Sequence, residues 1–420
     1  MKADQDTQIA ALRERPPQGL TSYWQVSAFL CTCLVIVLRR PDAILHAQFL
    51  YEDGQIWYAD AYNHGWWRAL FITHQGYFET IPRLGAALAI LFPFSLAPLI
   101  QNLFAICIQA APVSVLLSSR SSRWGSLSFR FSMAATYLLL PNTQDMMSTI
   151  TESQWFLAIV AFLVLTARPA HSKSQHIFDI LIISLCGLTG PFCIFLFPIA
   201  LYQFRSRRVP KILLIILFSG CLIQAATLLI AGNSREHPPL GIGFGAFFRI
   251  LTGQVFMGST IGHNSFGVIL PVSVLTMFSL LGLSILVGSF IVSTTEMRSF
   301  LIWSITLFTV SVFLTNEMPP PGVTEWHMLA VAYGLRYWLF PCLAFAWCIL
   351  YGYSSRRQTL RIACGALICL MMIGFMRDFR YRPLPDMKFN IYAAQLASAP
   401  SGSQVLIPTP FNWPMVLIKH

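Results

Sequence analysis

Long apolar runs separated by short polar segments make up most of this chain. A helix that crosses the hydrocarbon core of a bilayer needs about 20 predominantly apolar residues. Runs near this length recur along the chain, and two shorter ones share a glycine- and proline-containing break at 187–191. The pattern predicts about eleven transmembrane helices. They are expected near residues 22–38, 96–118, 127–141, 152–167, 176–189, 190–204, 211–231, 265–291, 299–315, 328–351 and 358–376.

The composition agrees with this layout. Hydrophobic residues make up 55% of the chain and charged residues 11%, whereas soluble globular domains carry about 25% charged residues. The ten cysteines form no CxxC pair and are expected to pack as small apolar residues. The segment 1–18 has charges of both signs and no small-residue cleavage site, which predicts a retained signal-anchor. We therefore expect an all-α polytopic membrane protein.

The distribution of positive charge sets the expected orientation, because cytoplasmic loops of membrane proteins carry an excess of Lys and Arg. With a cytoplasmic N-terminus, the cytoplasmic segments hold Arg120, Arg123, Arg130, Arg168, Lys173, Arg205, Arg207, Arg208, Lys211, Arg298, Arg356, Arg357 and Arg361. The opposite loops, 142–151 and 316–327, contain neither Lys nor Arg but include Asp145, Glu317 and Glu325. This predicts a multi-pass protein of the plasma (inner) membrane with its C-terminus on the outer face. Lipid-facing loops account for much of the net charge of +11, so no nucleic-acid partner is expected.

The first outer segment, 39–93, carries an unusual pair of acids. Glu52 and Asp53 are adjacent in a chain with only 17 acidic residues among 420. The stretch 55–73 that follows is too polar to span a membrane and too aromatic for a free loop, which predicts a helix lying in the membrane interface. Its tryptophans are expected in an aromatic belt: Trp57, Trp66 and Trp67.

The chain is expected to divide into two parts. Residues 1–376 contain all the predicted helices and the acidic outer loop, and they are expected to form one transmembrane domain. The outer-face tail, 377–420, is rich in proline and contains strand-like pieces. It is too short for an independent domain, so it is expected to pack on the outer surface, over the active cleft.

Several short blocks follow one another in a fixed order. They are Glu52-Asp53-Gly54, Gly76-Tyr77 with Pro82-Arg83, Gln154-Trp155, Leu188-Thr189-Gly190-Pro191-Phe192, and Tyr333-Gly334-Leu335-Arg336-Tyr337-Trp338. In this order, they resemble an uncharacterised bacterial group of the GT-C superfamily, membrane glycosyltransferases that use polyprenyl-phosphate-linked sugars. The sequence departs from that group at 151–153, where an Asn-containing turn is expected, and this leaves the role of Glu152 open.

The resemblance implies a GT-C-like bundle that transfers a sugar from a polyprenyl-phosphate donor to a glycan, lipid or protein acceptor on the outer face. It also implies an acidic general base in the first loop, either Glu52 or Asp53, which would take the proton of the acceptor hydroxyl. Gly54 is expected to leave access beside Asp53 and so favours that residue, although both stay open. The alternatives for the pair are a solvated turn and an ion pair with Arg39 or Arg40.

The donor phosphate leaves with negative charge, which cationic groups and directed N–H donors stabilise. Arg336 lies just inside the outer end of a predicted helix, where an arginine is costly and commonly functional. It is the first candidate for the phosphate ligand, with Tyr337 beside it, and the alternatives are snorkelling to the lipid head groups and pairing with Glu325. Arg83 and Arg249 are further phosphate candidates at the same depth.

Further outer-face side chains are expected to contact the substrates. They are Tyr77, Gln154, Trp155 and His327. None of the nine histidines has the i, i+4 spacing of a metal-binding helix, so neither a metal site nor a cofactor is predicted. The resemblance leaves a divalent cation open, because some GT-C enzymes need one. The expected partners are membrane lipids, the lipid-linked donor and the acceptor.

Two other functions compete with glycosyl transfer. A polysaccharide polymerase or ligase also joins lipid-linked sugars on the outer face, but its large catalytic loop is expected late in the chain. A transporter or flippase predicts charged residues deep within several helices and a repeat between halves of the chain. Most of the predicted helices lack a charge near their middle, which favours the transferase.

Overall fold

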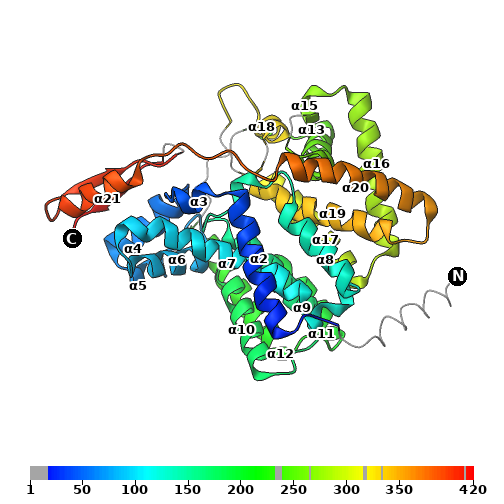
Figure 1. The fold of residues 1–420 in the computed structure, drawn as a ribbon, viewed down its shortest axis with the longest axis horizontal. Helices are drawn as coiled ribbons and strands as arrows, with labels where there is room; N and C mark the ends of the chain where they lie inside the picture. Colours follow the sequence, from blue (N-terminus) through cyan, green and yellow to red (C-terminus); the bar gives the residue numbers. More distant parts are fainter. Residues whose placement is uncertain (1–17, 232–238, 264–265, 316–318, 333, 411–412) are drawn as a thin grey trace.

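The computed structural model describes residues 18–231, 239–263, 266–315, 319–332, 334–410 and 413–420 (Figure 1). Helices account for nearly all of the regular structure, and one two-stranded sheet lies in the tail. The predictions that concern residues 1–17, Glu317 and Tyr333 lie outside the described residues.

Helices cover every predicted transmembrane run. They are α2 (Ser22–Arg39), α7 (Ala97–Leu117), α8 (Leu127–Leu139), α9 (Ser153–Thr166), α10 (Lys173–Gly187), α11 (Phe192–Arg205), α12 (Lys211–Ala231), α15 (Phe266–Ile269) with α16 (Val272–Val292), α17 (Thr295–Leu314), α18 (Glu325–Val331) with α19 (Leu339–Tyr353), and α20 (Gln358–Arg377). Within the described ranges, six helices are long and apolar enough to cross a membrane. The chain is therefore a mostly helical, multi-pass membrane protein. Because α8 to α11 have only 13 to 15 residues each, the number of about eleven spans stays a prediction.

The run expected as one helix at 328–351 is broken. Its two pieces, Glu325–Val331 and Arg336–Tyr353, are bent by 73° with respect to each other. Between them, Gly334 has a φ of 78°, a left-handed conformation that interrupts a helix and that glycine adopts without strain. The break places Arg336 at the start of a new helical segment rather than in the middle of one.

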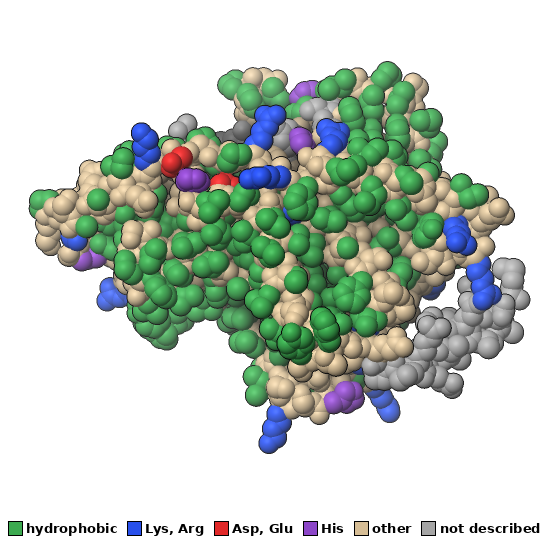
Figure 2. All heavy atoms as spheres, viewed as in Figure 1, with side chains coloured by type: hydrophobic (Ala, Val, Ile, Leu, Met, Phe, Trp, Pro, Cys, Tyr) green, Lys and Arg blue, Asp and Glu red, His purple; other side chains and the backbone are tan. Residues whose placement is uncertain are grey.

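The centre of the bundle is formed by α9 and α19, which are buried along almost their whole length. α9 packs against α7, α10 and α11, and α19 packs against α16, α17 and α20. Hydrophobic side chains cover much of the molecular surface seen in Figure 2, as expected of a surface that meets lipid.

The two ends of α9 define two ends of the molecule. We call the end at Ser153 the acidic end, because Glu152 and the first loop meet there. The end at Thr166 is the basic end, where Arg168 bonds to the backbone of Arg120. A helix of 14 residues is about 20 Å long, so the two ends are well separated.

The first loop consists of short helical pieces, as its aromatic pattern predicted. They are α3 (Asp42–Leu45), η1 (Asp53–Tyr58), α4 (Ala59–His64), α5 (Trp66–Ala69), α6 (Thr80–Ile90) and η2 (Phe94–Leu96). Trp66 and Trp67 are exposed and contact each other, which suits an aromatic belt. The same expectation is wrong for Trp57, which is buried and donates its indole N–H to Thr151.

The tail folds onto the first loop. It contains α21 (Phe389–Ser398) and an antiparallel hairpin of β1 (Gln404–Ile407) and β2 (Met415–Ile418), which extends beside α4 in Figure 1. Phe49 and Tyr58 of the loop form an apolar cluster with Phe389 and Met415 of the tail. The strand-like pieces of the sequence are therefore real strands, and β2 packs against η1.

Candidate active site

Asp53 is held by the loop that precedes α9. Its Oδ1 accepts hydrogen bonds from the Thr149 hydroxyl (3.0 Å), the Thr151 backbone N–H (2.9 Å) and the Thr151 hydroxyl (2.6 Å). The other oxygen, Oδ2, is buried and has no hydrogen-bond partner within the described part of the chain. The carboxylate is thus fixed in orientation by one oxygen while the second is left to accept a proton.

Burial raises the pKa of Asp53 to about 7. The three bonds from Thr149 and Thr151 lower the pKa, and the neighbouring charge of Glu52 raises it further, but the loss of hydration is the largest effect. A carboxyl group with a pKa near neutrality exchanges protons at physiological pH, which is what a general base requires.

The expectation that Gly54 leaves access beside Asp53 is wrong. Gly54 does not leave an open approach to the carboxylate, because a Cβ at this position would lie 2.8 Å from Cβ of Phe49 and 3.3 Å from Sδ of Met415. Gly54 instead allows the loop to pack tightly against the tail. Asp53 sits at the start of η1, a π-helical turn, which is a feature common at functional sites.

Arg336 is distant from Asp53 in sequence but pairs with a residue of the loop that holds Asp53. It begins η6 (Arg336–Trp338), and its guanidinium lies 3.3 Å from Oε1 of Glu152, the residue that follows Thr151. The expected alternative partner of Arg336 was Glu325, but the ion pair is made with Glu152. The Arg336 side chain is 31% exposed, whereas that of Glu152 is buried. Arg336 is therefore partly accessible from solvent.

The carboxyl group of Glu152 resembles that of Asp53. Burial raises its pKa to about 7, although the charge of Arg336 lowers it, and the charges of Glu52 and Asp145 raise it again. Its Oε2 has no hydrogen-bond partner among the described residues. A protonated Glu152 would release Arg336 from its ion pair.

Glu79 is a further buried acid at this site. It precedes α6, and its backbone forms a bridge with Thr189. Burial raises its pKa well above the usual value, and the charges of Glu152 and Glu52 add to the effect. We refer to Glu52, Asp53, Glu79 and Glu152 as the acidic cluster.

The block at 188–192 explains how Glu79 is held. Thr80 donates to the Leu188 carbonyl through its hydroxyl (2.7 Å), and the Gly190 N–H donates to the Phe78 carbonyl (2.9 Å). Gly190 has a φ of 68°, and a Cβ there would lie 2.1 Å from Oε1 of Gln154. Glycine adopts this left-handed conformation without strain, and the block holds the segment of the first loop around Glu79.

Arg83 forms an ion pair with Asp60 of the first loop. Its guanidinium donates to Oδ2 of Asp60 (3.1 Å) and lies over the ring of Trp57, 5.1 Å from the ring centre. Its Nε and one terminal nitrogen are buried without a hydrogen-bond partner among the described residues. The negative charge of Glu79 also acts on it. Arg83 thus borders the acidic cluster from the side of α6.

Arg39 and Arg40, the alternative partners considered for Glu52 and Asp53, contact other groups. Arg39 donates to the backbone carbonyls of Leu138 (2.6 Å) and Leu140 (2.9 Å) and contacts the Tyr381 ring. Arg40 lies 3.9 Å from Asp42. Among the described residues, the structure shows neither of the ion pairs considered as alternatives for Glu52 and Asp53.

The segment that precedes Arg336 is held by hydrogen bonds from two other parts of the chain, which we call the clamp. The side chain of Asn142 accepts the Gly334 N–H (2.7 Å) and donates to the Gln254 carbonyl (3.0 Å), while Gln254 donates to the Ala330 carbonyl (3.0 Å). The Asp145 N–H donates to the Gly334 carbonyl (3.2 Å). These bonds satisfy the backbone groups that the break in the helix leaves open.

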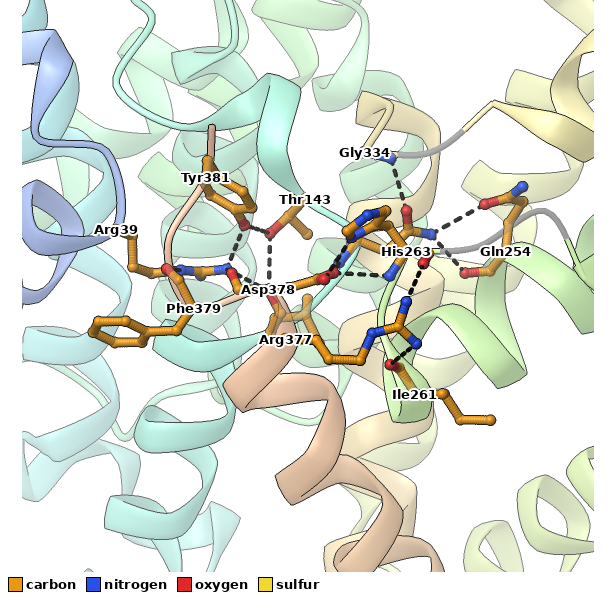
Figure 3. A network of polar contacts seen from close by, with 12 residues as sticks. Arg39, Thr143, Gln254, Ile261, His263, Gly334, Arg377, Asp378, Phe379 and Tyr381 are labelled. Carbon is orange, nitrogen blue, oxygen red and sulfur yellow. Dashed lines mark hydrogen bonds and ion pairs between the residues drawn. The ribbon is translucent and has the colours of Figure 1, made fainter. Parts of the chain in front are cut away.

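Asp378 anchors this clamp to the tail, as Figure 3 shows. Its Oδ2 accepts the backbone N–H groups of Asn142 (2.9 Å) and His263 (2.8 Å), and its Oδ1 contacts the imidazole of His263 (2.5 Å). Arg377 donates to the Ile261 carbonyl (3.2 Å) in the same network. One buried carboxylate therefore joins the end of α20 to two distant loops.

The remaining predicted substrate residues lie around the cluster in different settings. Tyr77 is half-buried and pairs through its backbone with His74, and Gln154 is packed against Gly190. Trp155 is buried between Phe192 and Phe340. Tyr337 lies beneath the Arg336 guanidinium, 5.4 Å from the ring centre. His327 is exposed in the first turn of α18, and among the described residues the structure shows no contact between it and the acidic cluster.

Sequence reasoning missed three of the residues that build the site. Thr149 and Thr151 orient Asp53, and Glu79 adds a buried acid; only the departure from the GT-C pattern at 151–153 marked this stretch as unusual. Within the described ranges, no group of three or more His, Cys, Asp or Glu side chains is arranged to hold a metal ion.

No protein-family model matches this chain, and neither does any of the curated proteins. Among solved structures, the chain is similar to the archaeal oligosaccharyltransferase AglB from Archaeoglobus fulgidus in complex with an inhibitory peptide and a dolichol-phosphate. The two share 13% sequence identity, with a TM-score of 0.41 over 90% of this chain and 58% of that one. This chain therefore spans little more than half the length of AglB. Since so low a TM-score carries no argument, we rest the proposals below on the residues of this chain.

Proposed function

We propose that this protein is a membrane glycosyltransferase that moves a sugar from a polyprenyl-phosphate donor to an acceptor hydroxyl. The observation that carries this proposal is the junction at Thr151 and Glu152. One of these adjacent residues orients Asp53, and the other pairs with Arg336. A base with a pKa of about 7 and an accessible arginine thus meet at one end of a helical membrane protein.

In the proposed reaction, Asp53 acts as the base and Arg336 as the ligand of the departing phosphate. Oδ2 of Asp53 takes the proton from the acceptor hydroxyl, and the acceptor oxygen forms a bond to the anomeric carbon of the sugar. The bond from that carbon to the phosphate oxygen breaks, and its electron pair stays on the phosphate. Arg336 stabilises the phosphate charge by paired N–H donation, for which the planar guanidinium is well suited.

The proton of Glu152 is coupled to phosphate binding in this scheme. Burial raises the pKa of Glu152 to about 7, and the charge of Arg336 limits that rise. When Arg336 turns toward a phosphate, that effect weakens and Glu152 takes up a proton, which avoids an unpaired buried charge. Glu79, with its raised pKa, limits the negative charge of the site in the same way.

The test is transfer from radiolabelled polyprenyl-phosphate sugars in membranes that contain the wild type, Asp53→Asn or Glu52→Gln. We expect Asp53→Asn to lose most of the transfer and Glu52→Gln to retain more of it. Loss only in Glu52→Gln would move the base to Glu52. Unchanged transfer in both variants, at matched protein levels, would rule out the carboxylate base.

A further inference from the structure

A second polar site lies at the basic end, far from the acidic cluster. A cavity of about 200 Å³ opens between the end of α9, the start of α10 and the turn that joins α11 to α12. We call it the basic cavity. Its charged and titratable lining residues are Arg120, Arg168, His176, Asp179, Arg207 and Arg208.

Two of the four arginines already have carboxylate partners. Arg120 forms a two-pronged ion pair with Asp179 at 2.7 and 2.6 Å, and it also donates to the Arg168 carbonyl (2.9 Å). Arg208 lies 3.3 Å from Glu296. These pairs are largely buried and form a fixed frame for the cavity.

The other two arginines supply an excess of positive charge. Within the part of the chain that the structure describes, neither the Arg168 nor the Arg207 guanidinium has an ion-pair partner. Four arginines against Asp179 and Glu296 leave a net charge of two positive units at the cavity with His176 neutral. Like charges gathered around one cavity repel one another, so an anion between them would be stabilised.

The backbone holds Arg207 at the cavity despite a conformational cost. Arg207 has a φ of 55°, a left-handed conformation that disfavours residues with a Cβ. The turn is closed by the Arg207 N–H to the Phe204 carbonyl (2.8 Å) and by the Arg208 N–H to the Gln203 carbonyl (2.9 Å). Glycine or asparagine would make this turn with less strain, yet an arginine occupies it.

We propose that the basic cavity binds a small phosphate-bearing anion. Guanidinium groups bind phosphate oxygens through paired N–H donors, and basic pockets between membrane helices hold phospholipid head groups. The volume of about 200 Å³ is large enough for a phosphate group. The general preference for arginine in cytoplasmic loops explains scattered surface arginines, but it does not explain their convergence on a cavity built around a fixed ion pair.

The test uses the purified full chain in a non-ionic detergent, with two probes that share the phosphate group. One probe is inorganic phosphate and the other is dihexanoyl-phosphatidylglycerol, and sodium chloride at equal ionic strength is the control salt. Binding is measured by the rise in the melting temperature and by the mass of adducts in native mass spectrometry. Arg168→Gln and Arg207→Asn remove the uncompensated charges. Arg207→Asn suits the left-handed turn and so is expected to fold.

We expect phosphate-bearing probes to stabilise the wild type more than chloride does, and each cavity variant to bind about tenfold more weakly. The matched control is Arg205→Gln, two residues earlier and outside the cavity lining, which should bind like the wild type. Tighter binding of the phosphatidylglycerol identifies a lipid head group as the source of the phosphate, whereas equal binding identifies a soluble phosphate. Equal stabilisation by chloride, or an equal loss in Arg205→Gln, would overturn the proposal. Since the readout is binding, it is independent of the proposed transferase activity.

Discussion

Thr151 donates both its backbone N–H and its hydroxyl to one oxygen of Asp53, at 2.9 and 2.6 Å. The two residues are 98 positions apart, and the contact ties the first loop to the start of the most buried helix of the bundle. Because the bonds converge on Oδ1, the chemistry proposed for Asp53 falls to Oδ2. Removing one of these bonds should therefore shift the pH at which the protein works.

The first prediction concerns Thr151→Val, which keeps the shape of the side chain and the backbone donor but removes the hydroxyl. That hydroxyl lowers the pKa of Asp53, so its loss should raise the pKa. A hydrogen bond to a charged group contributes about 1.5 kcal/mol or more, and one pKa unit corresponds to about 1.4 kcal/mol. We expect the acidic limb of the transfer rate to move upward by about one pH unit.

The control for this variant is Thr166→Val at the opposite end of α9. Thr166 is also buried, but its hydroxyl bonds only to backbone carbonyls of its own helix. It should leave the pH profile unchanged. A profile in Thr151→Val that coincides with that of the wild type would remove Asp53 as the group that titrates.

The second prediction concerns Arg336. Replacing it with Ala should lower transfer by about 10²- to 10³-fold, because it would remove the charge that stabilises the departing phosphate. Arg336→Lys keeps the charge but loses the fork of donors, so an intermediate rate is expected. The comparison is made with saturating and limiting donor in the same membranes.

The structure also predicts what Arg336→Ala does to stability. Without the arginine, the pKa of Glu152 should rise, so the carboxyl group stays neutral at pH 7 and the usual cost of an unpaired buried charge is avoided. The melting temperature should be close to that of the wild type at pH 6 and should fall below it at pH 8. Adding Glu152→Gln should restore it at pH 8; a double variant as unstable as the single one contradicts this account.

The helical architecture was predictable because apolar runs report directly on burial in lipid. Most runs became single helices, although those at 265–291 and 328–351 are each divided between two helices, and the strand-like pieces of the tail became a hairpin. The break near Gly334 was missed, since the sequence around it is apolar enough to read as one helix. A single left-handed glycine and the bonds from Asn142 decide the local conformation instead.

The acidic cluster was predictable only in part. Glu52 and Asp53 stood out because acids are rare in this chain, and Arg336 stood out because of its place in an apolar run. That Arg336 pairs with Glu152, and that Glu79 joins them, depends on how segments far apart in sequence pack. Periodicity and composition describe single helices and contain no information about such pairings.

The third prediction concerns stability as a function of pH. Burial raises the pKa values of Asp53 and Glu152 to about 7, so between roughly pH 4 and 7 the folded protein binds more protons than the unfolded chain. The stabilising contribution of each group is therefore complete below pH 4 and is lost as the pH rises through 7. Melting temperatures in detergent should fall from pH 5 to pH 8, and they should fall less steeply in Asp53→Asn. An unchanged slope in that variant would show that Asp53 does not titrate in this range.

The fourth prediction tests how the first loop is held. Gly190→Ala places a Cβ against Gln154 at a left-handed position, so we expect the variant to be less stable by about 1–3 kcal/mol and to lose transfer as the segment around Glu79 shifts. The matched control is Gly243→Ala, where a Cβ meets nothing within 4 Å and the backbone is extended. Gln154→Ala in the Gly190→Ala background should recover part of the stability, since it relieves the clash but not the backbone strain.

The fifth prediction separates positioning of Arg336 from its chemistry. Asn142 has a φ of 58° and holds the Gly334 N–H two residues before Arg336. Asn142→Ala should lower the transfer rate with saturating donor by about tenfold, a loss of about 1.4 kcal/mol, because a misplaced guanidinium stabilises the departing phosphate less well. Asn142→Asp keeps the acceptor oxygen and tolerates the left-handed conformation but loses the N–H donated to the Gln254 carbonyl, so it should recover only part of the rate. If Asn142→Asp and Asn142→Ala reduce the rate equally, the hydrogen bond to Gly334 does not position Arg336. Asn142 then contributes only to the stability of the fold.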